Sequence, residues 1–254
     1  MYRATMRDVK KTSEARMEPI KISDDLYFVG CYQASSHLID TGDGLVLIDT
    51  GYERTLYLVI ESIWEAGFDP RDVKYIINTH WHFDHVEASG MMADLSGAKN
   101  LISEVDAPEA EKRGYFKPDI LIRDGDKLTV GNKTFEFMLT PGHTKGTISI
   151  FFDTTVNGKP YRVGTFGGAG VNSLVPSFGT YYNGCRDDYL RSCERLSAEH
   201  VDIFIGNHVW NNDTEVKGNI LKKEGKNPFI DANEWTKFLE FCKERCLSLP
   251  PIEV

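Results

Sequence analysis

The apolar positions of this chain fall into many short runs, which is the pattern of a protein rich in strands. Residues 45–48 are continuously apolar, and such a run is typical of a strand buried on both faces. Residues 41–44 read Thr-Gly-Asp-Gly and predict a hairpin turn before this strand. Strands are predicted over residues 26–29, 36–40, 45–48, 73–77, 99–103, 119–122, 127–130, 134–139, 147–152, 161–166 and 201–205.

Helical periodicity follows several of these strands. Apolar residues recur from Leu56 to Trp64 at intervals of three and four positions, which predicts an amphipathic helix that ends near Gly67. Further helices are predicted over residues 86–95, 189–196 and 235–246. Each half of the chain is a run of strands followed by a helix. We therefore expect an α/β protein with two packed sheets and helices outside them.

Length and composition indicate one globular domain. The chain has 254 residues, of which 41% are hydrophobic, enough for a sizeable core. No segment approaches the roughly 18 consecutive apolar residues that a membrane-spanning helix needs. Residues 19–254 are predicted to form the domain, and the polar residues 1–18 a flexible or partner-bound arm.

Charge and cysteine content restrict the partners and the compartment. The net charge of −9 argues against a nucleic-acid partner, since such a partner requires a basic surface. The N-terminal residues lack the apolar segment of a secretory signal, which predicts a cytoplasmic protein, although a trimmed N-terminus would hide a secreted origin. Five scattered cysteines favour free thiols in a reducing compartment. We expect a small-molecule substrate and neither a nucleic-acid nor a membrane partner, and we leave an oligomer open.

The densest chemistry follows the predicted strand at residues 73–77. His80, His82, Asp84 and His85 fall within six residues, in a chain with only 7 histidines. In extended backbone His80 and His82 point to the same side, because side-chain direction repeats every two residues. Imidazole and carboxylate are ligands of zinc, so this loop is predicted to serve two neighbouring metal ions.

Two further histidines stand just after predicted strands. His143 follows Thr140-Pro141-Gly142, and His208 follows Gly206-Asn207. Either histidine alone is typical of a turn, but the first cluster needs partners and favours both as ligands. A packed sheet aligns its strand ends, so His143 would join His80 and His82, and His208 would join Asp84 and His85. Of the remaining histidines, we interpret His37 as structural and His200 as exposed.

These motifs resemble those of the metallo-β-lactamase superfamily. Residues 79–85 match its T-H-x-H-x-D-H signature in full, residues 47–51 match the preceding strand and turn, residues 140–144 match the third motif, and residues 206–208 match the last. The resemblance runs from about residue 20 to residue 213. It implies a four-layer αβ/βα sandwich of two mixed β-sheets flanked by helices.

The resemblance also implies a dinuclear site that holds two Zn²⁺ ions, with iron or manganese as alternatives. The implied ligands are His80, His82 and His143 for one ion and Asp84, His85 and His208 for the other. Asp84 would in addition be catalytic, because it would orient the metal-bound hydroxide that attacks the substrate. Asp49 would position the ligand loop.

One departure from the superfamily pattern restricts the reaction that we expect. Many hydrolases of the superfamily place a metal-bridging Asp after the fourth motif strand, and the first lactamase subclass places a Cys there, but residues 161–168 contain neither. The third subclass of metallo-β-lactamases also lacks both, and Thr165 would supply the small hydroxyl that it has near this place. One fewer negative charge between two metal ions favours a more acidic bound water, which suits the opening of an amide or an ester.

We therefore expect a dinuclear zinc-dependent hydrolase whose favoured substrate is a β-lactam. Tyr181, Tyr182 and Asn211 are candidates for substrate contact, since they lie in loops after strand ends. The alternative is a cytoplasmic hydrolase of a lactone, ester or thioester at the same site. A binding protein without catalysis and an iron redox enzyme are less favoured, because the six-ligand set is intact and the bridging Asp is absent.

Overall fold

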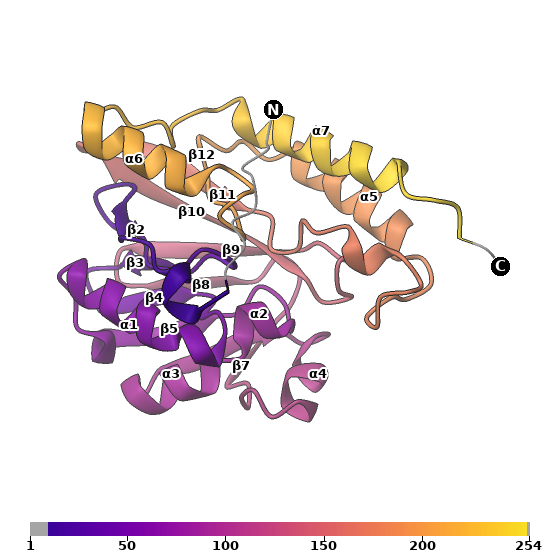
Figure 1. Ribbon diagram of the computed structural model, residues 1–254, viewed down its shortest axis with the longest axis horizontal. Helices are drawn as coiled ribbons and strands as arrows, with labels where there is room; N and C mark the ends of the chain where they lie inside the picture. The colour runs from indigo at the N-terminus through magenta and orange to yellow at the C-terminus, as the bar shows by residue number, and fades with distance from the viewer. Residues whose placement is uncertain (1–9, 253–254) are drawn as a thin grey trace.

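Two mixed β-sheets packed face to face form the centre of the molecule (Figure 1). The computed structural model describes residues 10–252. The first sheet has seven strands in the order β1-β2-β3-β4-β5-β6-β7, and the second has five in the order β12-β11-β10-β9-β8. The first is antiparallel from β1 to β4 and parallel from β4 to β7. The second is antiparallel except for the parallel pair β11–β12.

The strands of the first sheet are β1 (Ile20–Lys21), β2 (Leu26–Phe28), β3 (His37–Asp40), β4 (Leu45–Ile48), β5 (Val73–Ile77), β6 (Lys99–Ser103) and β7 (Ile120–Ile122). Those of the second are β8 (Lys127–Val130), β9 (Lys133–Leu139), β10 (Ile148–Val156), β11 (Lys159–Thr165) and β12 (Ile203–Phe204). The α-helices are α1 (Leu56–Glu65), α2 (Phe83–Val86), α3 (Ser89–Ser96), α4 (Ala107–Lys112), α5 (Cys185–Ser197), α6 (Thr214–Glu224) and α7 (Glu234–Leu247). Short 3-10 helices are η1 (Thr12–Ala15), η2 (Glu53–Thr55), η3 (Pro70–Asp72) and η4 (Asn172–Leu174).

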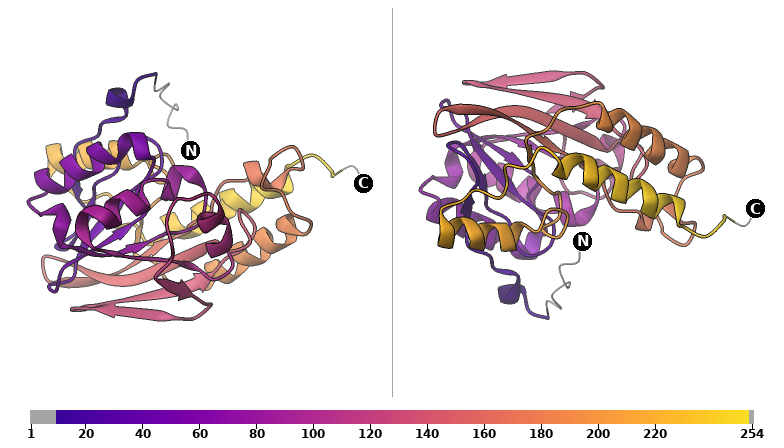
Figure 2. Two further views of the ribbon diagram at one scale, coloured as in Figure 1. Left: turned by 90° about the horizontal axis from the view of Figure 1, so that it is seen from below. Right: turned by 90° about the horizontal axis from the view of Figure 1, so that it is seen from above.

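Helices cover the outer face of each sheet, so the predicted α/β sandwich is confirmed. Helices α1 and α3 lie on the first sheet, where Val59 and Ile63 pack in one cluster with Leu47 and Ile76. Helices α5 and α7 lie side by side on the second sheet (Figure 2). Within residues 10–252, no helix combines the length and the apolar character needed to cross a membrane.

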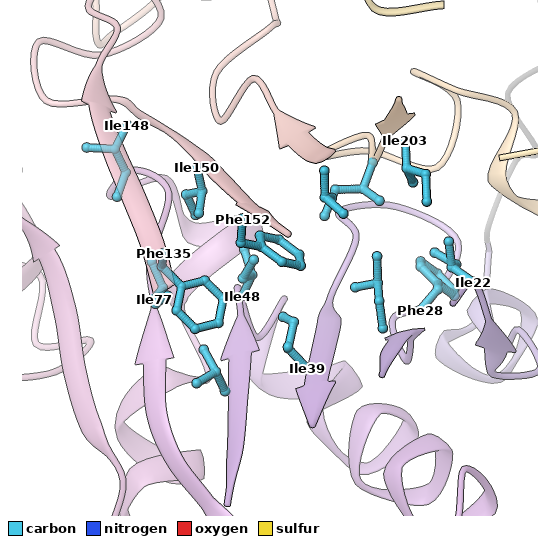
Figure 3. Close-up of a cluster of buried hydrophobic side chains, with 14 of the residues drawn as sticks. Ile22, Phe28, Ile39, Ile48, Ile77, Phe135, Ile148, Ile150, Phe152 and Ile203 are labelled. Carbon is cyan, nitrogen blue, oxygen red and sulfur yellow. The ribbon is translucent and has the colours of Figure 1, made fainter. Parts of the chain in front are cut away.

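The core between the sheets is built from alternate side chains of facing strands. Ile48 and Ile77 of the first sheet meet Phe135 and Phe152 of the second (Figure 3). The rings of Phe135 and Phe152 pack with centroids 5.2 Å apart. This core holds β5 and β10 in fixed relation, and the metal-ligand loops begin where such strands end.

Replacing Phe152 with alanine tests this core. Phe152 is fully buried, so Phe152→Ala leaves a cavity and is expected to lower the free energy of unfolding by about 3–5 kcal/mol. Urea unfolding followed by circular dichroism measures the change. The half-exposed Tyr57 provides the control, because Tyr57→Ala should stay within about 0.5 kcal/mol of the parent protein. Equal losses in the two variants would contradict the assignment of Phe152 to the core.

The helix predicted over residues 86–95 is divided in the structure. Helix α2 begins earlier, at Phe83, and α3 begins at Ser89. The carbonyl of His85 accepts hydrogen bonds from Thr50 N (2.9 Å) and Gly51 N (3.1 Å). The loop after β4 therefore occupies this carbonyl oxygen, and the helical conformation is interrupted between α2 and α3. The helix predicted over residues 86–95 is confirmed from Ser89 onward, and the residues before Ser89 differ because the loop after β4, which the local sequence does not reveal, contacts the chain there.

Strands β10 and β11 reach closer to each other than the strands predicted over residues 147–152 and 161–166. Strands β10 and β11 pair as far as Val156 and Lys159, and Asn157 and Gly158 alone turn the chain with φ of 52° and 76°. These angles suit a tight hairpin turn with an Asn-Gly sequence. Asp24 accepts hydrogen bonds from the backbone of both turn residues.

Part of the N-terminal region, residues 15–17, packs against the domain. Residues 1–9 of the predicted arm lie outside the described residues. Ala15 and Met17 are buried, and Ala15 O accepts a hydrogen bond from Tyr32 N. Arg16 pairs with Glu61 of α1 at 3.2 Å. Residues 15–17 therefore lie along the edge of the first sheet and its helix. All five cysteines are buried and free, as predicted.

Candidate metal centre

The structure brings the six predicted ligands together as two groups of three. His80 and His82 follow β5, Asp84 and His85 lie in α2, and His143 and His208 follow β9 and β12. The groups are His80, His82 and His143, and Asp84, His85 and His208, and the ligand atoms within each lie within 4.8 Å of one another.

The first group is held by backbone and hydroxyl oxygens behind its rings. His143 Nδ1 lies 2.7 Å from Gly170 O and 3.0 Å from Ser173 Oγ. When Nδ1 donates its proton to the carbonyl, the lone pair of Nε2 faces the site. His82 Nδ1 stands 2.9 Å from this Nε2. The two ring nitrogens therefore converge on one place.

The second group is fixed by Asp49. His85 Nδ1 donates to Asp49 Oδ2 at 2.7 Å, which leaves Nε2 of a neutral ring without a proton. This Nε2 lies 3.3 Å from His208 Nε2 and 3.5 Å from Asp84 Oδ2. Asp84 Oδ2 is in turn 3.6 Å from His208 Nε2. Unprotonated acceptors gathered so closely repel one another unless a cation or a proton lies among them.

His80 joins the two groups. Its ring centroid lies 4.8 Å from that of His82 and 4.3 Å from that of His85. His80 Nδ1 contacts Thr79 Oγ1 at 3.1 Å, whereas Nε2 is buried and has no hydrogen-bond partner among the described residues. A buried nitrogen without a partner is costly, and a metal ion would satisfy it. The residues therefore fit a two-metal site of imidazole and carboxylate ligands.

Burial keeps most of these imidazoles neutral. It lowers the pKa of His143 to about 4 and that of His208 to about 3. Burial likewise lowers the pKa of His80 and His82. For His85, burial lowers the pKa, but the carboxylates of Asp84 and Asp49 outweigh it and raise the pKa overall. Neutral rings can bind a metal at neutral pH without first losing a proton.

The backbone conformation of Asp49 directs its carboxylate towards the ligand loop. It is buried, with φ of 55°, an uncommon value for a residue with a side chain. Its Oδ1 accepts from Thr79 N and its Oδ2 from Thr79 Oγ1, both at 2.8 Å. Together with the bond from His85, these contacts connect the end of β4 to both sides of the ligand loop.

Thr165 is predicted to stand close to the ligands as a supporting residue. It lies buried at the end of β11, paired with Ile150, and no hydrogen bond joins it to a ligand in the described part of the chain. Gly167 and Gly168, which follow Thr165, lie directly against Thr79 and His143. A Cβ on Gly168 would stand 2.8 Å from His143 Cβ, and one on Gly167 would stand 2.9 Å from Thr79 Cβ. This segment packs tightly, because its backbone lies directly against Thr79 and His143.

Four ligands, His82, Asp84, His143 and His208, line a cavity of about 520 Å³. Its other walls are aromatic and cationic. They include Trp81, Phe83, Phe178, Trp210, Arg113 and Arg245. Trp210 stacks on the His208 ring with centroids 4.4 Å apart. An aromatic cavity above a polar base suits an organic molecule with one reactive polar group.

The residues predicted to contact the substrate line two different cavities. Asn211 lines this cavity, and its Oδ1 accepts from His208 N at 2.9 Å, so it also holds the His208 turn. Tyr181 and Tyr182 instead line an adjoining cavity of about 390 Å³.

Asp106 is a buried carboxylate that the sequence reading missed. It accepts hydrogen bonds from Trp81 N (3.2 Å), Thr144 Oγ1 (2.6 Å) and Gly146 N (2.8 Å). It thereby connects the loop of His80 and His82 to the loop of His143. Burial raises its pKa to about 6. An acidic residue shortly after an apolar strand was the available signal.

Comparison with known proteins agrees with this geometry. Residues 29–206 match the Metallo-beta-lactamase superfamily. BJP-1, a subclass B3 metallo-beta-lactamase of Bradyrhizobium japonicum, superposes with a TM-score of 0.85 at 27% identity, over 93% of this chain and 95% of that one. The metallo-beta-lactamase FEZ-1 from Legionella gormanii gives 0.85 and 27%, over 92% and 96%.

Curated relatives match over shorter lengths. Hydroxyacylglutathione hydrolase of Bartonella tribocorum is 33% identical over 140 residues, which are 54% of this chain and 50% of that protein. The chain spans about half the length of the curated relatives it matches. The superfamily match covers well over half of the chain, and the structural neighbours share its two sheets and its helices. The chain therefore belongs to the metallo-beta-lactamase superfamily, with subclass B3 enzymes among its structural neighbours.

Proposed function

We propose that this protein is a hydrolase that uses two zinc ions to open a cyclic amide, and that its substrate is a β-lactam. The observation that carries the proposal is the convergence of His80, His82 and His143 beside Asp84, His85 and His208. Zinc ions held by these groups would lower the pKa of water and polarise the carbonyl under attack.

The side chains of this chain have separate tasks in such a reaction. The Nδ1 atoms of His85 and His143 each donate a hydrogen bond to a protein oxygen, so the Nε2 atoms of both rings face the site. Asp84 is the one carboxylate among the six groups, so it is the side chain that can take a proton from water and pass it to the leaving nitrogen. Trp81, Phe178 and Trp210 hold the organic part of the substrate and keep bulk water away.

Two features support the lactam over other acyl substrates. Residues 164–170 contain no Asp, Glu or Cys, so no bridging carboxylate reduces the positive charge of the site, and a more electrophilic centre favours attack on an amide. The likeness to two subclass B3 metallo-beta-lactamases extends over more than nine tenths of the chain. The sequence-based choice of zinc rests on the imidazole-rich ligand set, with iron and manganese as alternatives.

A thioester hydrolase is the second candidate. It is favoured by the match to hydroxyacylglutathione hydrolase, whose identity of 33% exceeds the 27% of the two structural neighbours. That match, however, covers only about half of each protein. A lactone or a simple ester would enter the same cavity by the same chemistry.

Turnover of a chromogenic cephalosporin tests the proposal. The purified protein with two equivalents of zinc should hydrolyse it, a chelator should lower the rate at least about a hundredfold, and added zinc should restore it. Metal analysis should find about two zinc ions per chain. Chelator-sensitive hydrolysis of a thioester or a lactone without hydrolysis of the cephalosporin would move the assignment to the second candidate. A protein that binds no zinc and gains no activity from it would overturn both.

A further inference from the structure

A second cavity adjoins the metal cavity. Its volume is about 390 Å³, and it shares four lining residues with the metal cavity: Trp81, Arg113, Gly179 and Thr180. Trp81 stands between the two, because its ring also packs edge-on against His82 with centroids 4.6 Å apart. A molecule that reaches from the ligands past Trp81 therefore enters the second cavity.

The second cavity carries an excess of positive charge. Its cations are Lys112, Arg113 and Lys145, whereas its carboxylates are Asp106 and Glu109. Glu109 is shared between Lys112 (3.5 Å) and Arg113 (3.8 Å). This local sign is opposite to the net charge of −9 of the whole chain.

The carboxylate of Asp106 does not form an ion pair with Lys145. Asp106 is turned inward and uses its oxygens on Trp81 N, Thr144 and Gly146 N. Lys145 has no carboxylate within 4.0 Å in residues 10–252, and its Nζ lies 5.3 Å from the ring centroid of Tyr182. Lys145 is therefore available to a ligand.

The neutral groups of the cavity also suit a polar ligand. Thr180 Oγ1 is buried and has no hydrogen-bond partner among the described residues. It lies on the wall shared by both cavities. The guanidinium of Arg113 stacks over Trp81 at 4.2 Å from the ring centroid, which restricts its motion. A restrained guanidinium loses less conformational freedom on binding a carboxylate.

We propose that this cavity is a second substrate subsite, which binds a carboxylate at the far end of the acyl side chain of the substrate. Lys112 and Lys145 attract the carboxylate, Arg113 and Thr180 offer it hydrogen bonds, and Tyr181 and Tyr182 enclose the alkyl part. This inference rests on the hydrolase function proposed above. It adds that the preferred substrate bears an anion several bonds from the scissile carbonyl, since Trp81 lies between the two places.

A matched pair of cephalosporins tests the subsite. One carries a glutaryl side chain, and the other carries the corresponding uncharged glutaramide. The lactam and its ring carboxylate are the same in both. KM for the glutaryl compound should be about fivefold lower, as expected for one or two exposed ion pairs, and the ratio should fall towards one at high salt.

Variants assign the effect to the cavity. In the double variant Lys112→Met/Lys145→Met the ratio of the two KM values should fall to about one, and in Lys145→Glu it should invert. The control is Lys222→Met, because Lys222 is exposed and pairs with Glu18 instead of lining this cavity. The control should keep the fivefold ratio. Equal KM values for the two compounds in the parent protein, or a ratio unchanged in the double variant, would overturn the proposal.

Two further measurements separate this proposal from the proposed function. Thioesters that carry the same glutaryl and glutaramide side chains form a second matched pair. Preferential hydrolysis of the glutaryl thioester, without hydrolysis of the cephalosporins, would support the subsite and refute the lactam as the substrate. Isothermal titration of both cephalosporins with the zinc-loaded variant Asp84→Asn compares affinities without turnover. Equal affinities there would contradict the subsite, whichever bond the enzyme cleaves.

Discussion

The variant Asp84→Asn is expected to lose kcat by about a thousandfold or more. Asp84 Oδ2 lies within 3.6 Å of the ring nitrogens of His85 and His208. Burial raises its pKa, but His85 and His208 outweigh burial and lower the pKa overall, so the side chain is a carboxylate at neutral pH. An amide neither accepts a proton nor offsets metal charge. The assay is kcat with a chromogenic cephalosporin at saturating zinc, together with the zinc content and the circular dichroism spectrum.

A parallel loss is expected for His143→Ala, which removes one ring of the other group. The matched control is His200→Ala, because His200 is exposed and pairs only with Asp202 among the described residues. The control should keep kcat within about twofold, as expected for a surface substitution. Near-normal turnover in Asp84→Asn or in His143→Ala would refute the assignment of the two ligand groups.

The second large effect is expected for Asp49→Asn, and it should appear in stability as well as in metal binding. Asp49 accepts three hydrogen bonds, two from Thr79 and one from His85. The amide nitrogen of asparagine would face one of these donors, so a buried donor would lose its acceptor. We expect the free energy of unfolding to fall by about 3 kcal/mol. Zinc affinity should fall about 10–100-fold, because the His85 ring loses the contact that orients it.

Chemical unfolding and a competitive zinc-chelator titration measure the two losses separately. Asp43→Asn is the control, since Asp43 is exposed and pairs with Lys74 at 2.7 Å. It should change stability by less than about 1 kcal/mol. If Asp49→Asn bound zinc as tightly as the control, the proposed role of Asp49 would be wrong, even if the variant were less stable.

The convergence of the six candidate ligands could be predicted from the sequence because their signals are local. An apolar run followed at once by polar metal-binding groups marks the end of a buried strand, as at β5 and His80. Sheet packing then brings His143 and His208 to the same edge, although they are far apart in the chain. The ranges of β4, β5, β6 and β8 follow from apolar runs in the same way.

The walls of the site could not be predicted in this way. Asp106 takes its partners from the loops of Trp81 and of Thr144, which are 25 and 38 residues away, so its place shortly after an apolar strand does not show which loops it connects. The placement of Thr165 required the register of β11 against β10, which a sequence pattern does not give. Helix α6 carries a glycine and an asparagine at its centre, at Gly218 and Asn219, which obscures its periodicity.

The glycine segment beneath His143 limits the evolutionary routes open to this enzyme. A Cβ at Gly167 would stand 2.0 Å from Ile148 O, and one at Gly168 would stand 2.8 Å from both His143 Cβ and Thr147 Cγ2. A bridging Asp therefore cannot arise at either position by one substitution without displacing a ligand or a strand. A lineage that gained this carboxylate at either position would therefore also have to shift the chain at residues 147 and 148.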